Sequence, residues 1–444
     1  MTKEKNNKPS KELPLGFVDR QEKELLVRDF IISNIKEVMI KYGFQYLETP
    51  SFEYSDSIGK FLPDKDRPDE GVFSFKDENK WLSLRYDLTA PLARYVAKNY
   101  LEIPKPFKRY QLGTVWRNEK PGPGRFREFL QFDADFVGTK SLQADAELCV
   151  MISEIFKNCG LSKEEYIIKI SSRKITEELF KKINVDNNEQ KLTALRALDK
   201  IDRLGWGEVK QLLGEGRKDK SGDFTEGANL SSSNIVIIEK ELKKKSPETE
   251  DLLEILKIFN DYAFTNYEFD PSIIRGLEYY TGPIFEVNLK FDVKNNKGQA
   301  IQFGSIGGGG RYDNLVNNFG NFEAPATGIS IGLDRLVYAL MQKKDFKIKQ
   351  SKPVIICVFD KNTLKDYIKL QTILRDAGIS AEIYPGENKL KKQMEYANKI
   401  KSPAVILYGE DEIKSGKPTL RDLSSGEEKS VAIKELVNEI KKII

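Results

Sequence analysis

The chain has 444 residues, enough for two or three domains of ordinary size. Its 39% hydrophobic content is typical of a globular protein, and no apolar run approaches the roughly 20 residues that cross a bilayer. The 72 basic and 68 acidic residues leave a net charge of +4, which alone does not indicate a nucleic-acid-binding protein. Histidine is absent, so Ser–His and Cys–His catalysis and His-based zinc sites are excluded.

The N-terminus and the cysteines indicate an intracellular protein. Residues 1–12 lack the apolar stretch of a secretory signal, and we expect a flexible tail there. Cys149, Cys159 and Cys357 are odd in number and lie at no zinc or redox spacing. We expect buried free thiols in a reducing cytoplasm, and hence a cytoplasmic protein with no membrane segment.

The first expected element is a long helix over residues 19–42. Apolar residues recur there at helical spacing, namely Leu25, Leu26, Phe30, Ile31, Ile35, Val38 and Met39. Asp19 with Glu22 suits a capped start, and Gly43 suits the position just past the end. A strand follows at residues 44–47, and this arrangement is typical of a structural or dimer-forming element.

The distribution of expected strands and helices divides the chain into domains. Strands and helices mix over residues 13–168, whereas residues 169–262 are helical and highly charged and are expected to form an insertion. Residues 263–345 return to strands with Gly-rich turns, and residues 346–352 form a linker. Residues 353–444 alternate strands and helices, which predicts a compact, partly parallel sheet with helices on its faces. The expected fold class is therefore α+β: an antiparallel sheet flanked by helices, a helical insertion and a C-terminal α/β domain.

Residues 113–136 read as two antiparallel strands around a Pro/Gly turn at residues 120–124. Along the second strand one face carries Leu130, Phe132, Ala134 and Phe136, and the other carries Arg127, Phe129, Gln131, Asp133 and Asp135. The apolar face is expected to pack on a core. The polar face must meet either water or a ligand, because polar groups are not buried without partners. Alternation alone favours water.

Three further segments carry unusual residues. Residues 275–282 set a lone arginine among aromatic residues and two glycines. Residues 307–310 are four glycines, too costly in entropy for an ordinary strand, which suggests a close approach of two backbones. Residues 328–336 read as a strand feeding a helix, with Arg335 near the helix N-terminus. Taken singly, each segment also fits a turn, a bulge or a surface arginine.

Together, in this order, these segments resemble a class II aminoacyl-tRNA synthetase. The strand ending at Pro50 resembles the first motif of that class. The hairpin with Arg117 and Glu119 resembles the second motif, and residues 328–335 resemble the third. Such motifs are short and degenerate, so they indicate the class and little more.

The more specific resemblance is to the histidyl-tRNA synthetase family. Residues 84–89, 275–280 and 309–313 are similar to signatures of that family. The resemblance covers nearly the whole chain, and residues 353–444 are similar to the family's anticodon-binding domain. It implies a catalytic domain made from residues on both sides of the insertion.

The resemblance implies a set of histidine-binding residues. Asp87, Thr89 and Gln131 match residues that hold the amino group, where a carboxylate suits an ammonium. Asp135 and the tyrosines at residues 279–280 match the imidazole pocket, and leaving such groups unpaired rejects a wrong amino acid by about 10⁴ or more. The full expected set is Asp87, Thr89, Arg117, Gln131, Asp135, Arg275, Tyr279 and Tyr280.

The resemblance also implies how ATP is bound. Glu119 and Phe129 would hold adenine by a hydrogen bond and by stacking, and Arg335 would bind the terminal phosphates. Arg125 and Arg127 both lie beside the turn, and the sequence leaves open which of them touches ATP.

The expected catalytic residues are Arg117 and Arg275. They would flank the α-phosphate and stabilise the charge that develops as the histidine carboxylate attacks. ATP and Mg²⁺ are the implied cofactors, with no metal site formed by protein residues.

The implied function is that of a histidine–tRNA ligase. It activates L-histidine with ATP to histidyl-adenylate, releases pyrophosphate and transfers the aminoacyl group to the 3′ end of tRNA(His); a homodimer is the implied assembly. The alternatives are a non-catalytic regulatory subunit of ATP phosphoribosyltransferase and a related ligase for another amino acid. Regulatory paralogues usually lack the anticodon-binding domain and have degraded motifs, whereas residues 353–444 and Arg117, Arg275 and Arg335 are all present. The sequence therefore favours the ligase.

Overall fold

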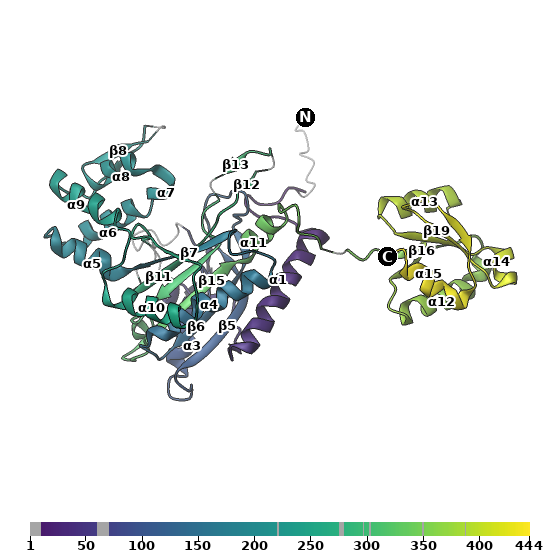
Figure 1. The fold of residues 1–444 in the computed structure, drawn as a ribbon, viewed down its shortest axis with the longest axis horizontal. Coiled ribbons are helices and arrows are strands. Elements are labelled where there is room, and N and C mark those ends of the chain that lie inside the picture. The colour runs from purple at the N-terminus through teal and green to yellow at the C-terminus, as the bar shows by residue number, and fades with distance from the viewer. Residues whose placement is uncertain are drawn as a thin grey trace. The chain divides into compact units, whose positions relative to one another are not determined.

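The computed structural model describes residues 10–59, 71–219, 222–274, 279–295, 297–301, 303–348, 350–386 and 388–444. The chain divides into two compact units, Met1–Lys347 and Ile348–Ile444 (Figure 1). Within the described ranges, no helix is both long enough and apolar enough to cross a membrane. Cys149, Cys159 and Cys357 are free and buried, as expected, and burial raises the pKa of Cys159 and of Cys357 to about 12.

The expected N-terminal helix is α1 (Glu22–Lys41). Its buried residues Val27, Ile31, Ile35, Val38 and Met39 are those that the helical spacing selects. Gly43 has a φ of 71°, which agrees with its expected place past the helix end. The expected start is wrong: Gln21 precedes the first turn, and no side chain caps it. Glu22 and Glu24 stabilise the first turn through the helix dipole instead.

The first unit is built on an eight-stranded sheet. Its strands, in order across the sheet, are β1 (Gln45–Tyr46), β5 (Phe107–Trp116), β6 (Glu128–Val137), β15 (Ala326–Gly332), β14 (Gly307–Arg311), β11 (Pro283–Leu289), β7 (Tyr166–Ser172) and β10 (Tyr267–Phe269). The edge strands β1 and β10 run parallel to their neighbours, and the other neighbouring pairs are antiparallel. The expected antiparallel sheet is thus confirmed.

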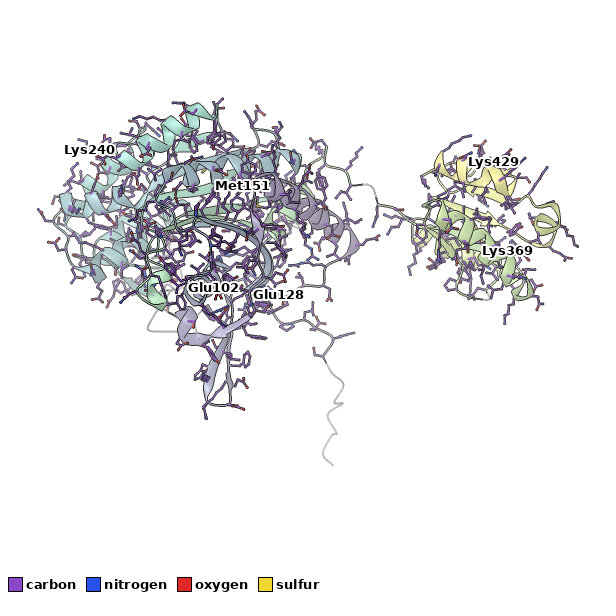
Figure 2. All side chains as sticks on the ribbon, turned by 90° about the horizontal axis from the view of Figure 1, so that it is seen from below. Glu102, Glu128, Met151, Lys240, Lys369 and Lys429 are labelled. Carbon is purple, nitrogen blue, oxygen red and sulfur yellow. The ribbon has the colours of Figure 1, made fainter. Side chains whose placement is uncertain are left out.

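One face of this sheet is apolar and carries helices. α1 lies beside α4 (Leu142–Asn158) and α11 (Leu333–Leu340), and α10 (Glu250–Asp261) packs on α4 and β7 (Figure 1). Met151 of α4, labelled in Figure 2, is fully buried in this layer. The strands contribute buried side chains from alternate positions, among them Phe132, Ala134, Ile168, Ile170, Phe285, Ile329 and Ile331.

Smaller elements complete the first unit. They are β2 (Phe52–Tyr54), α2 (Ser55–Gly59), β3 (Ser74–Asp77), β4 (Lys80–Leu84), α3 (Thr89–Lys98), β12 (Val293–Lys294), β13 (Ala300–Ile301) and the 3-10 helix η1 (Val316–Phe319). β2, β4 and β3 form a three-stranded sheet, and β12 pairs with β13. Buried residues of α3, including Leu92 and Val96, form a cluster with Leu315 and Val316 beside η1.

Residues between β7 and α10 form a helical region with its own core. Its elements are α5 (Arg173–Lys182), α6 (Asn188–Leu198), α7 (Ile201–Leu204), α8 (Trp206–Leu213), β8 (Gly216–Lys218), β9 (Phe224–Glu226) and α9 (Ser232–Leu242). Leu179, Leu198, Leu213 and Ile238 are part of that core. β7 and α10, at the two ends of this region, pack with the large sheet and its helices.

The second unit has a five-stranded sheet in the order β17-β16-β18-β19-β20. Its elements are β16 (Val354–Cys357), the 3-10 helix η2 (Lys361–Thr363), α12 (Leu364–Asp376), β17 (Ala381–Ile383), α13 (Leu390–Lys399), β18 (Ala404–Leu407), α14 (Glu410–Ser415), β19 (Thr419–Asp422), β20 (Glu428–Ser430) and α15 (Ile433–Lys441). The first three strands in this order are parallel, and β19 and β20 are antiparallel. α13 packs on one face and α12 and α15 on the other, which confirms the expected partly parallel sheet with helices on both faces.

Candidate active site

Most of the polar face of β6 is buried rather than exposed to solvent. On this face Gln131, Asp133 and Asp135 expose 5%, 2% and 2% of their surfaces, whereas Glu128, at the start of the strand and on its other face, is exposed (Figure 2). The expectation from alternation that this face meets water is therefore wrong for these three residues. The reason lies in other parts of the chain, because contacts from α3 and from Tyr312 after β14 reach this face.

A buried ion pair anchors the far end of this face. Arg109 of β5 is directly opposite Asp135 of β6, and an Arg109 terminal nitrogen lies 3.0 Å from Asp135 Oδ2. The same nitrogen donates to the carbonyl of Leu88 at 2.9 Å, and Tyr312 donates its hydroxyl to Asp135 Oδ1. Burial raises the pKa of the Asp135 carboxyl, and the Arg109 charge opposes that rise.

Glycines make room for this carboxylate. Gly328 is directly opposite Asp135, and a Cβ on Gly328 would lie 2.0 Å from Asp135 Oδ1. A Cβ on Gly309 would lie 1.9 Å from the Gly328 carbonyl oxygen, so β14 and β15 approach too closely for side chains there. The glycine run forms a strand, and the expected close approach of two backbones is confirmed.

Asp133 lies on the same face and accepts from one amide donor and one hydroxyl donor. Gln131 Nε2 donates to Asp133 Oδ1 at 2.8 Å, and Thr89 Oγ1 donates to Asp133 Oδ2 at 3.3 Å. Burial, and then the nearby charge of Asp135, raises the pKa of Asp133 to about 7. The structure thus brings Thr89 and Gln131, two expected histidine-binding residues, onto one buried carboxylate.

Asp87 holds the start of α3. Its Oδ1 accepts the backbone N–H groups of Thr89 at 3.1 Å and of Ala90 at 2.9 Å. These bonds satisfy donors that a helix N-terminus leaves unpaired. Burial raises the pKa of Asp87, while the two amides and the charges of Arg117 and Arg109 lower it.

Arg117 lies between two aromatic rings. Its guanidinium carbon is 4.4 Å from the centroid of Tyr86 and 5.2 Å from that of Phe129. Its Nε donates to the Tyr86 carbonyl at 3.2 Å, and a terminal nitrogen donates to Gln131 Oε1 at 3.5 Å. The expected catalytic arginine is thus held at the edge of the buried polar face.

Glu119 is surrounded by groups that favour its ionised form. Tyr86 donates its hydroxyl to Glu119 Oε1 at 2.7 Å, and Arg125 forms an ion pair with Oε2. Burial alone would raise the pKa of Glu119, but the charges of Arg117 and Arg125 lower it. Arg127 Nε donates to the Glu119 carbonyl at 3.0 Å. Both arginines lie beside the site because both bond to Glu119; Arg125 is exposed and Arg127 is partly buried.

The expected imidazole residues are joined to Asp135 through Tyr312. The Tyr279 ring centroid is 4.8 Å from that of Tyr280 and 5.8 Å from that of Tyr312, which bonds to Asp135. Burial raises the pKa of Tyr279 well above its usual range. The other expected member of this segment, Arg275, lies outside the described residues.

Arg335 lies in the first turn of α11. Its guanidinium carbon is 4.7 Å from the centroid of Phe303. The preceding residue, Asp334, accepts the Leu130 N–H at 2.7 Å and pairs with Arg20 at 2.9 Å. Asp334 therefore fixes the start of α11 against β6. The position of the Arg335 backbone is set by this contact, because Arg335 is the next residue of the helix.

Four residues of this cluster were not among those expected: Tyr86, Arg109, Asp133 and Tyr312. Asp133 could have been found, since it alternates in phase with Gln131 and Asp135. Arg109 has no such signal, because its pairing depends on the register of β5 with β6. In the described part of the chain, Arg109 Nε and its second terminal nitrogen have no hydrogen-bond partner, which suits a site that receives a polar ligand.

Comparisons with known proteins identify the family of the chain. A family model described as histidyl-tRNA synthetase matches residues 16–336, and one described as an anticodon binding domain matches residues 352–443. The histidine–tRNA ligase of Bartonella quintana is 45% identical over 460 residues, covering 97% of this chain and 92% of that protein. The histidine–tRNA ligase of Rhodopseudomonas palustris is 46% identical over 465 residues, covering 96% and 91%.

Solved structures share the fold. The crystal structure of histidyl-tRNA synthetase from Nostoc sp. PCC 7120 has a TM-score of 0.74 and 26% identity, covering 98% of this chain and all of that one. A structure from Bacillus halodurans, described as an ATP phosphoribosyltransferase regulatory subunit/histidyl-tRNA synthetase, has a TM-score of 0.66 and 22% identity, covering 88% and 97%. At that identity the second likeness shows the fold alone.

The Arg109–Asp135 pair generates a prediction about stability. Asp135→Asn keeps the shape of the side chain but leaves the buried Arg109 charge without its counter-ion. We expect the free energy of unfolding to fall by about 3–5 kcal/mol. Denaturant unfolding measures it, with Glu323→Gln as control, because the Lys140–Glu323 pair is exposed and exposed pairs contribute little to stability. Equal small losses in the two variants would contradict a structural role for the pair.

Proposed function

Because the chain belongs to the histidyl-tRNA synthetase family, we propose that histidine and ATP react at the buried polar face of its large sheet. The chain is an aminoacyl-tRNA ligase, and its reaction is that of a histidine–tRNA ligase. The regulatory-subunit alternative has less support. The relatives named histidine–tRNA ligase match nearly the whole chain, and an anticodon binding domain matches residues 352–443.

We propose that Asp87, Thr89 and Gln131 bind the amino end of histidine, and that Asp135, with the tyrosines at residues 279–280, receives the imidazole ring. The contact of Thr89 and Gln131 with one buried carboxylate supports the first group. The chain of contacts from Tyr279 through Tyr312 to Asp135 supports the second. Such a buried polar site selects its ligand, since an amino acid that left these groups unpaired would bind poorly.

The chemistry needs no histidine in the protein. The nucleophile of the first step is the carboxylate of the amino acid, which is already ionised near neutral pH. It attacks the α-phosphorus of ATP, and pyrophosphate leaves. The protein must therefore supply orientation and positive charge rather than a base. In the second step, the tRNA hydroxyl attacks the carbonyl carbon of the adenylate, an ester bond forms, the acyl–phosphate bond breaks and AMP leaves. The hydroxyl proton passes to a carboxylate or to an oxygen of the substrates.

Positive charge comes from arginines around the nucleotide. We propose that Arg117 and Arg275 flank the α-phosphate and that Arg335 binds the terminal phosphates. The fixed position of Arg117 between two rings supports its role, because a positioned cation stabilises developing charge without reorganisation. Arg275 follows from the family and lies outside the described residues.

We propose that Glu119 accepts a hydrogen bond from adenine and that Phe129 stacks on it. The lowered pKa of Glu119 supports the first role, since the carboxylate stays an acceptor at neutral pH. Arg125 and Arg127 remain joint candidates for a further ATP contact, as both bond to Glu119.

Magnesium enters with the nucleotide. In the described residues, no group of three or more acidic or Cys side chains is placed to hold a metal ion. Mg²⁺ usually binds through substrate phosphates, its own waters and one or two carboxylates. We therefore propose that Mg²⁺ is carried by the ATP phosphates, where it neutralises charge.

The remaining proposals concern the domains and the cell. We propose a tail at residues 1–12 and a catalytic core from residues 13–168 and 263–345, together with β7 and α10, which pack with it. The rest of residues 169–262 would form the insertion, and residues 346–352 the linker to an anticodon-binding domain at residues 353–444 that binds tRNA(His). Three buried free thiols support a cytoplasmic location.

An exposed apolar sheet face supports the proposed homodimer. Phe52, Tyr54 and Phe75 expose 50%, 48% and 44% of their surfaces. The register puts them on one face, because Tyr54 and Phe75 both pair with Leu82 and Phe52 pairs with Leu84. A contiguous apolar surface of this kind on a single chain is typical of an interface, here with a second copy.

The first prediction from these proposals concerns Arg117. Arg117→Lys keeps the charge but loses the planar group that stacks between Tyr86 and Phe129. We expect the rate constant of histidine-dependent ATP–pyrophosphate exchange to fall by about 10²–10³, with a smaller change in the KM for ATP. Arg217→Lys, in the ion pair with Glu208 of the insertion, is the matched control. A raised KM with an unchanged rate constant would assign Arg117 to binding alone.

The second concerns the dimer. The double variant Phe52→Glu/Phe75→Glu places two charges on the proposed interface, and charges are unfavourable at an apolar interface core. We expect a monomer by light scattering at concentrations where the unmodified protein is a dimer. Phe224→Glu, at an equally exposed Phe of the insertion, should leave the dimer intact. A dimeric double variant, or a monomeric unmodified protein, would contradict the proposed interface.

The third concerns the division of labour between the two units. Each has its own hydrophobic core, so Met1–Lys347 is expected to fold without Ile348–Ile444. The shortened chain should keep histidine-dependent pyrophosphate exchange within a few-fold. It should charge tRNA at least about 100-fold less efficiently, a loss of roughly 2.7 kcal/mol. Collapse of exchange in a folded, dimeric shortened chain would contradict this division.

A further inference from the structure

Asp133 is a buried carboxylate that has no role in the assignments above. It is 2% exposed and lies on the polar face of β6, between Gln131 and Asp135 in alternation. Its two oxygens accept from Gln131 Nε2 and from Thr89 Oγ1, both neutral donors. A buried carboxylate is costly unless a cation pairs with it.

The neighbouring charged groups already have partners. Asp135 is paired with Arg109, and Asp87 accepts two backbone amides of α3. Arg85 donates to the carbonyl oxygens of Thr114 and Thr49. Among the residues whose placement is described, Asp133 itself forms no ion pair; the charges of Arg109 and Arg85 act on it from nearby without contacting it.

The side chain of Gln131 links the Asp133 carboxylate to Arg117. Its Nε2 bonds to Asp133 Oδ1 at 2.8 Å, and its Oε1 accepts from Arg117 at 3.5 Å. A fixed anion and a fixed cation therefore lie at the two ends of one amide group. A free α-amino acid carries an ammonium and a carboxylate on the same carbon, so its two charges match this pair in sign and in close spacing.

We propose that Asp133 is a second counter-ion of the histidine α-ammonium, beside Asp87, with the histidine carboxylate directed toward Arg117. The ammonium gives Asp133 a directly paired cation, which it lacks among the described residues, while Thr89 and Gln131 hold the Asp133 carboxylate in place. This inference deepens the proposed function and rests on the assignment of this face to histidine. A bound ammonium also favours the ionised form of Asp133, whose pKa burial and Asp135 raise to about 7.

The experiment separates the ammonium from the rest of the ligand. Histidinol keeps the ammonium and imidazole but has no carboxylate, whereas 3-(imidazol-4-yl)propionate keeps the carboxylate and imidazole but has no ammonium. Inhibition constants of both are measured in histidine-dependent pyrophosphate exchange with the full chain and its Asp133→Asn variant. We expect the variant to raise the inhibition constant of histidinol by roughly 30-fold or more, which is the usual effect of unpairing a buried charge. The inhibition constant of imidazolepropionate should rise by less than about threefold.

Controls distinguish a structural role from charge recognition. Asp251→Asn neutralises another buried aspartate that accepts from a hydroxyl, that of Ser172, and should change neither constant. Parallel weakening of both analogues by Asp133→Asn, or no weakening of either, would overturn the inference. If Asp133→Asn does not fold, Asp133→Glu moves the charge by one methylene group and should still weaken histidinol more than imidazolepropionate; a parallel change would again overturn it. Failure of both analogues to inhibit the unmodified protein would instead contradict the proposed histidine site.

Discussion

The buried pair of Arg109 and Asp135 is the interaction on which the rest of this site depends. Neither charge is reached by water, so each can exist there because the other is 3.0 Å away. The pair also ties separate parts of the chain together, because Arg109 bonds to the backbone before α3 and Asp135 accepts from Tyr312 after β14. Losing one partner would disturb the positions of α3 and Tyr312 together. A buried ion pair adds little net stability to a fold, but this one fixes the local positions of the groups bonded to it.

The same pair explains one glycine of the central strands, Gly328. A carboxylate buried against a sheet needs space on the neighbouring strand, and Gly328 supplies it. The approach of β14 to β15 then leaves no room for a Cβ on Gly309. The glycine run looks unfavourable for a strand when it is considered alone. It becomes understandable once the space required by Asp135 and by the Gly328 backbone is included.

The sequence predicted those features that local patterns determine. The helix α1, the hairpin of β5 and β6, the strand β15 feeding α11 and the sheet of the second unit all follow from periodicity and turn residues. Burial of the polar face could not be predicted, because it depends on α3, which is distant in sequence. The same holds for Arg109, whose partner is set by strand register. The place of α10 was also hidden, since α10 carries charged residues like the helices before it but packs with α4 and β7.

A site made of charges and hydrogen bonds places recognition and stability in the same residues. Asp87 illustrates this, because the oxygen that caps α3 belongs to a carboxylate that the family would use for the substrate. Thr89 is similar, since its amide joins α3 to Asp87 while its hydroxyl reaches Asp133. Binding of a zwitterionic substrate would then add charge pairing to contacts that already exist in the free protein. The substrate meets groups that are fixed beforehand, so little of its binding energy is used to order them. More of that energy is left for the orientation that the reaction requires.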